Sequence, residues 1–125
     1  LARRGKYFAV WQGFMQGRYI LCFTKEILME YEEILTQKLG VRIARNVMEV
    51  ISSRSNIRKL DIHFRFNLIQ VDPDDNKFVD CAVAANAYCI VSQDKHYAVL
   101  KEIDFPKVEV ISIDEFLDYL KQGIS

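Results

Sequence analysis

The sequence predicts an α/β fold in which a mostly parallel sheet is covered by helices. Short, uninterrupted apolar runs, such as residues 19–23 and 89–92, have the length of buried strands. These runs alternate with stretches whose apolar residues recur every three or four positions, which is the spacing of helices. Strands that alternate with helices along the chain favour a parallel sheet with right-handed crossovers.

The composition predicts a single folded domain over residues 1–125. Half of the 125 residues are hydrophobic and 27% are charged, which excludes a disordered chain. No apolar stretch reaches the roughly 18 residues that a membrane span requires. Cys22, Cys81 and Cys89 lie in apolar runs without a CxxC pattern, and so they indicate small buried side chains in a reducing compartment. We therefore expect a cytoplasmic protein that does not bind a membrane.

The first half of the chain predicts three helices and one strand. Tyr7, Val10 and Phe14 share one helical stripe, which Gly17 ends, and the strand at residues 19–23 follows. Thr24 can cap the second helix, which ends near Gly40. Apolar residues at helical spacing over residues 41–51 predict the third helix.

The second half of the chain predicts shorter elements. The pattern of residues 57–66 is ambiguous and predicts no particular element. The remaining expectations are a strand at 67–71, a turn at 72–75, a helix at 78–85, a strand at 89–92, a short helix at 96–101 and a strand at 108–111. Ser112 and Glu115 form a capping-box pattern that opens the last helix.

Carboxylates follow two of the predicted strands. Ligands of open parallel sheets bind beyond the carboxyl ends of the strands, and Asp72, Asp74, Asp75, Asp80 and Asp94 fall there. Converging carboxylates raise each other's pKa, and a divalent cation removes that cost. Ligation by oxygen alone suits Mg²⁺ or Mn²⁺. Turn formation and helix capping are the commoner reasons for aspartates at the first three positions.

Glu30 lies within the apolar stripe of the second helix. Its neighbours at helical spacing are Ile27 and Tyr31. A buried carboxylate needs a partner, which is either a cationic side chain or a metal ion. Alternatively, Glu30 lies at the edge of the stripe and reaches solvent beside Glu26 and Glu33.

Two segments resemble the PIN-domain family. They are DPDDNKFVDCAVAANA at residues 72–87 and IVSQDKH at residues 90–96, and the similarity is to the subgroup described as toxins of toxin–antitoxin systems. CFTKEILMEYEEIL at residues 22–35 resembles the second acidic motif of that subgroup. VISIDEFL at residues 110–117 resembles its last strand and helix, so the resemblance covers essentially the whole chain.

The resemblance implies a three-layer α/β/α sandwich and a nuclease that uses Mg²⁺ or Mn²⁺ to hydrolyse RNA. It also implies a cognate antitoxin protein as a partner. By residue, the resemblance makes Glu30, Asp80 and Asp94 the catalytic acids, and these three with Asp75 the metal ligands. Thr24 and Ser92 match small hydroxyl residues that line the pocket.

The family pattern begins with an apolar strand that ends in Asp-Thr-Asn, and the sequence shows no such segment. We therefore expect an N-terminally incomplete domain in which a central strand and the first metal-binding aspartate are missing. Unpaired strand edges favour association, so a homo-oligomer, most simply a dimer, is expected. The alternative function is a catalytically silent PIN-like module that binds a partner or acts as a scaffold.

The zero net charge conceals an uneven distribution. Residues 36–65 carry a net charge of +5, whereas residues 70–125 carry −6. A basic region beside an acidic site could hold RNA, or it could be an ordinary solvated helix face. The candidate RNA-binding residues are Arg42, Arg45, Arg54, Arg58 and Lys59.

Overall fold

The computed structural model describes residues 5–70, 72–92 and 94–122. In chain order the elements are α1 (Lys6–Met15), β1 (Leu21–Phe23), α2 (Lys25–Leu39), α3 (Val41–Ser53), β2 (Ile57–Lys59), the 3₁₀ helix η1 (Pro73–Asp75), α4 (Asn76–Ala85), β3 (Ile90–Val91), the 3₁₀ helix η2 (Lys95–Glu102), β4 (Val110–Ile111) and α5 (Ile113–Lys121). Among these, no helix is both long enough and apolar enough to cross a membrane.

The helix boundaries follow from local sequence signals. The Thr24 hydroxyl oxygen accepts a hydrogen bond from the Ile27 backbone N–H at 3.2 Å, which begins α2 as predicted. Gly40 has a φ of 90°, a conformation that favours glycine, and so the chain turns there from α2 into α3. Ser112 and Glu115 form the predicted capping box of α5.

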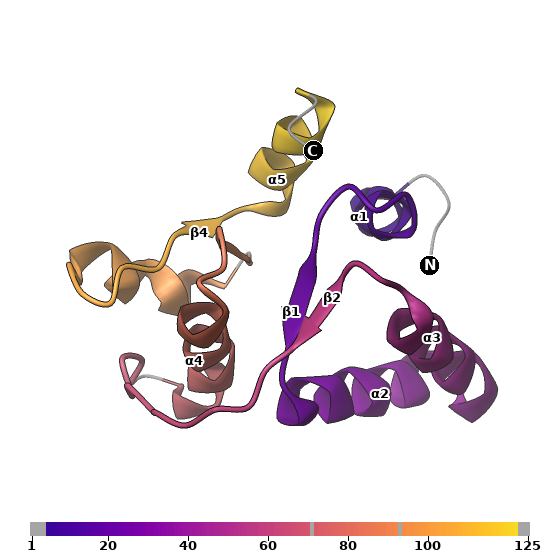
Figure 1. The fold of residues 1–125 in the computed structure, drawn as a ribbon, viewed down its shortest axis with the longest axis horizontal. Helices are drawn as coiled ribbons and strands as arrows, with labels where there is room; N and C mark the ends of the chain where they lie inside the picture. The colour runs from indigo at the N-terminus through magenta and orange to yellow at the C-terminus, as the bar shows by residue number, and fades with distance from the viewer. Residues whose placement is uncertain (1–4, 71, 93, 123–125) are drawn as a thin grey trace.

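The strands are parallel, as predicted, but they form two sheets of two strands each. In one sheet β1 pairs with β2, with Leu21 opposite Ile57. In the other, β3 pairs with β4, with Ile90 opposite Val110. Helix α4 contacts both β1 and β3, and Figure 1 shows it between the α2–α3 pair and the chain that leads to α5. An α/β fold with short parallel strands is therefore confirmed, but a single central sheet is not.

The predicted strand at residues 67–71 is wrong over the residues that the structure describes there, 67–70. Asn67 has a left-handed φ of 53°, which breaks an extended run. The Asn76 side chain then bonds both backbone groups of Ile69, so a side chain replaces a neighbouring strand as their partner. Val71, the last residue of that prediction, lies outside the described residues. The ambiguous stretch at 57–66, by contrast, contains strand β2.

Helix α4 joins two apolar cores. Cys81 belongs to a cluster with Phe23 and Ile27, near β1 and α2. Val79 belongs to a second cluster, whose other fully buried members include Ile69. Because both faces of α4 are packed, polar residues on this helix are held in fixed positions between the two cores.

Candidate active site

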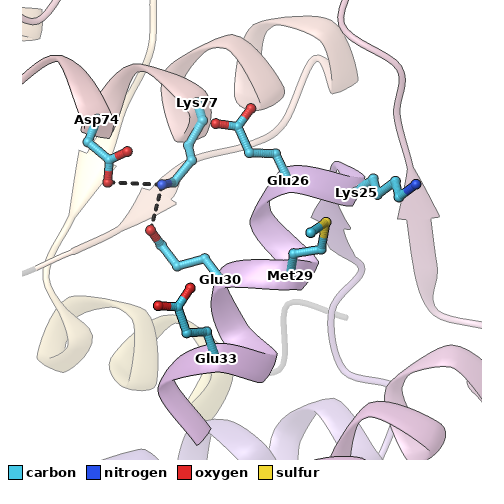
Figure 2. A pocket seen from close by; sticks show the side chains of 7 residues that line it. All are labelled: Lys25, Glu26, Met29, Glu30, Glu33, Asp74 and Lys77. Atoms are coloured by element: carbon cyan, nitrogen blue, oxygen red, sulfur yellow. Dashed lines mark hydrogen bonds and ion pairs between the residues drawn. The ribbon is translucent and has the colours of Figure 1, made fainter. Parts of the chain in front are cut away.

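A crevice lies between the first turns of α2 and the start of α4 (Figure 2). Charged side chains from both helices and from η1 predominate in it. The lining residues are Lys25, Glu26, Met29, Glu30, Glu33, Asp74 and Lys77. The crevice therefore contains the predicted catalytic residue Glu30, with four carboxylates against two ammonium groups.

Lys77 is the cationic partner of Glu30. Its Nζ lies 2.5 Å from Glu30 Oε1 and 2.9 Å from Asp74 Oδ2. Dashed lines in Figure 2 mark both contacts. Only 8% of the Lys77 side chain is exposed, against 28% of Glu30. The expectation that Glu30 needs a cation or a metal ion is thus met by a lysine. The sequence offered one signal for Lys77, its position three residues after Asp74.

The two carboxylates also keep Lys77 charged. Burial lowers the pKa of Lys77, but hydrogen bonds and charge interactions with Glu30 and Asp74 raise it more, and the net effect is an increase. In this structure the crevice therefore contains a charged ammonium group between two carboxylates.

Asp80 is almost fully buried on α4, with 2% of its surface exposed. Its Oδ1 accepts a hydrogen bond at 3.1 Å from the backbone N–H of Phe66. Phe66 immediately precedes residues 67–70, the segment that forms no strand. Asp80 therefore fastens that segment to α4, a role that the sequence did not reveal.

Tyr97 on η2 interacts electrostatically with three of the four predicted metal ligands. Burial raises the pKa of the Tyr97 phenol, and the negative charges of Asp75, Asp94 and Glu30 raise it further. These carboxylates come from three different parts of the chain, so the fold brings them within electrostatic reach of one buried hydroxyl group. Tyr97 was not among the predicted site residues, although it follows Asp94 by three positions.

The two predicted pocket hydroxyl groups both bond to the backbone. The Thr24 hydroxyl caps α2, and Ser92 Oγ accepts a hydrogen bond from the Asp94 N–H at 3.0 Å. Neither residue lines the crevice between α2 and α4. Ser92 fixes the backbone at Asp94, whose side chain is exposed.

The carboxylate donors suit Mg²⁺ or Mn²⁺ in chemistry, but their placement does not fit a bound ion. Within the described parts of the chain, no three His, Cys, Asp or Glu side chains lie close enough together to hold a metal. Glu30 is bonded to Lys77, and Asp80 is bonded to the backbone of Phe66. A metal site would therefore require Glu30 to exchange its partner.

The candidate RNA-binding residues fall into two groups. Arg42 and Arg45 on α3 and Lys59 on β2 are exposed. Arg58 is also exposed but donates a hydrogen bond to the Ala85 carbonyl at 2.9 Å, and the partly buried Arg54 likewise donates to a backbone carbonyl. Arg54 and Arg58 thus stabilise the fold in this structure.

Comparison with known protein families gives one match. A family model described as PIN domain matches residues 1–96, which include α1, both strands of the first sheet, the crevice and Asp94. Neither the curated proteins nor the solved structures contain a significant match to the chain.

Proposed function

Because the chain belongs to the PIN-domain family, whose members are generally nucleases, we propose that it is an endoribonuclease that hydrolyses RNA phosphodiester bonds. The observation that supports the proposal is the crevice between α2 and α4, in which Lys77 pairs with both Glu30 and Asp74 while Glu30 stays partly exposed. Charged groups that meet in one crevice from distant segments are typical of sites with a chemical role.

The proposed reaction is the attack of a water oxygen on phosphorus, with cleavage of the bond to the leaving sugar oxygen. A carboxylate that lines the crevice can accept the proton of the attacking water. Glu30 suits this role, because Lys77 fixes one of its oxygens and the side chain remains partly exposed. Asp80 holds the backbone at Phe66 against α4.

We propose Mg²⁺ or Mn²⁺ as the cofactor, since PIN domains typically use divalent metals and the candidate ligands are all carboxylates. The donor residues of the proposal are Glu30, Asp75, Asp80 and Asp94. In the described residues, no three of these carboxylates lie close enough together to hold an ion.

The biological role that we propose is that of a toxin in a toxin–antitoxin pair in the cytoplasm. It rests on the resemblance of residues 72–87 and 90–96 to that subgroup. The partners would be an RNA substrate, an antitoxin protein and a second copy of the chain. Expression of the chain should arrest the growth of a bacterial host, and Glu30→Gln should relieve the arrest.

The three-layer sandwich around one central sheet also belongs to the proposal. Its support is the parallel pairing within each sheet and the contact of α4 with both. A crystal structure in which further backbone joins β1 to β3 would establish it.

An RNA cleavage assay tests the proposed function. The wild-type chain, Glu30→Gln and Asp80→Asn are compared on a fluorogenic RNA with Mn²⁺ or with EDTA. Glu30→Gln should lower the rate roughly 100-fold or more, which is the lower range for loss of a proton-transfer group. Asp80→Asn should also lower the rate, because it removes a proposed metal ligand. Glu33→Gln is the matched control, because Glu33 is exposed on the same helix and lines the same crevice.

Unchanged cleavage by both variants would contradict the assigned residues. A folded wild-type chain that binds a partner protein but cleaves no RNA would favour the alternative, a catalytically silent binding module.

A further inference from the structure

Lys77 occupies an unusual place for a lysine. Its stem emerges from the first turn of α4, and its ammonium lies between Glu30 on α2 and Asp74 in η1 (Figure 2). Lysine is rarely buried unless its charge is paired. The side chain is buried here while the ammonium keeps two carboxylate partners, so its position is determined by those partners.

The surrounding charge favours a cation at this point. Besides the two partners of Lys77, the crevice is lined by Glu26 and Glu33, and Lys25 is its other basic residue. In Figure 2, Lys25 points away from the Glu30–Lys77–Asp74 group. Lys77 is therefore the cation that neutralises the carboxylates at the centre of the crevice.

We propose that Lys77 is the built-in counter-cation of the crevice and competes with a divalent metal ion for the carboxylate of Glu30. The inference rests on the proposed function, from which it takes Glu30 as a metal ligand. The ion pair with Lys77 thus opposes metal binding at Glu30, in addition to the separation of the predicted ligands in the described residues.

The competition follows from distance and charge. A ligand oxygen lies about 2.0–2.1 Å from Mg²⁺, whereas Nζ lies 2.5 Å from Glu30 Oε1. An ion bound to this carboxylate would have a second cation beside it, and like charges at such a separation repel strongly. Metal binding therefore requires the ammonium to move away from Glu30 and to remain paired with Asp74 alone.

The test compares Mn²⁺ affinity by isothermal titration and by the thermal shift that Mn²⁺ produces. Lys77→Met removes the charge but keeps an apolar stem that suits the buried site. We expect it to bind Mn²⁺ roughly tenfold more tightly than the wild-type chain, because one repelling charge is gone. Lys77→Arg keeps the charge and should bind Mn²⁺ about as weakly as wild type.

Lys25→Met is the matched control, since Lys25 lines the same crevice but is exposed and points away from Glu30. Its Mn²⁺ affinity should remain within about twofold of wild type, because solvent screens an exposed charge. Equal or weaker Mn²⁺ binding by Lys77→Met than by wild type would overturn the inference, and so would an absence of binding in every variant.

A second measurement needs no substitution at Lys77. In wild-type protein labelled with ¹⁵N-lysine, saturation with Mg²⁺ should shift the Lys77 Nζ resonance and leave that of Lys25 unchanged. An unshifted Lys77 resonance in a chain that binds Mg²⁺ would also overturn the inference.

The two proposals can fail separately. If the wild-type chain cleaves RNA with a metal ion but Lys77→Met binds Mn²⁺ no more tightly, the proposed nuclease function stands and the proposed competition fails. If Lys77→Met binds Mn²⁺ more tightly but the wild-type chain cleaves no RNA, the competition stands and the nuclease function fails.

Discussion

The side-chain amide of Asn76 bonds both backbone groups of Ile69. Its Oδ1 accepts from the Ile69 N–H and its Nδ2 donates to the Ile69 carbonyl oxygen, each at 2.8 Å. Both residues are buried, and Asn76 is the first residue of α4. This pair therefore fastens the segment before η1 to the helix that supplies Lys77 and Asp80.

Asn76→Ala should lower the free energy of unfolding by about 2–4 kcal/mol, because it leaves two buried backbone groups without their partner. Urea unfolding followed by circular dichroism measures the change. Asn46→Ala, on an exposed position of α3, is the control and should change stability by less than about 0.5 kcal/mol. Similar losses for the two variants would show that the Asn76–Ile69 pair contributes little.

Substitutions of Asp80 should separate its structural role from the proposed catalytic role. Asp80→Ala removes the acceptor of the Phe66 N–H and should cost about 1–3 kcal/mol of unfolding free energy. Asp80→Asn retains a side-chain oxygen and should cost less, while RNA cleavage is lost in both. Equal unfolding midpoints for the two variants would contradict a structural role for the Asp80–Phe66 bond.

The stability of the fold should fall at alkaline pH. Burial raises the pKa of Tyr31 from 10.0 to about 12, with smaller contributions from Cys81 and Glu30. The folded state thus holds this proton more tightly than the unfolded state. The associated stability is fully present below pH 10 and is lost as the pH rises toward about 12.

Tyr31→Phe tests this pH dependence, because phenylalanine does not titrate. Above pH 10, the free energy of unfolding of wild type should fall more steeply than that of Tyr31→Phe. The difference in slope should reach up to about 1.4 kcal/mol per pH unit, the value for one proton. Tyr7→Phe is the control, since Tyr7 is 65% exposed. Parallel pH curves for wild type and Tyr31→Phe would contradict the prediction.

The basic face of α3 offers a test of RNA binding. Arg42 and Arg45 are exposed on this helix, so Arg42→Gln with Arg45→Gln should weaken the binding of single-stranded RNA. The slope of log affinity against log salt concentration should also become shallower, by about 0.7 for each phosphate that the double variant no longer neutralises. Fluorescence anisotropy in the Asp80→Asn background measures binding without cleavage.

Lys121→Gln, at an exposed position near the end of α5, is the control for a general reduction of positive charge. Equal salt slopes for this control and for the double variant would show that α3 does not bind RNA.

The sequence predicted the structure best where interactions between residues close in the chain decide it. The Thr24 cap, the turn at Gly40 and the Ser112–Glu115 capping box all depend on residues within four positions of each other. It failed at residues 67–70, because the hydrogen bonds of Ile69 go to Asn76, seven residues away. An apolar run shows that a segment is buried but not which group satisfies its backbone.

The sequence by itself determined the helices, the parallel character of the strands and the acids that are candidates for the site. These follow from periodicity, capping and the positions of charges along the chain. Only the tertiary structure decided what each acid contacts. Lys77 pairs with Glu30 across 47 residues, and carboxylates from three separate segments raise the pKa of Tyr97. Such pairings depend on how the helices pack, because the interaction of two charges depends on their distance in space and not on their separation along the chain.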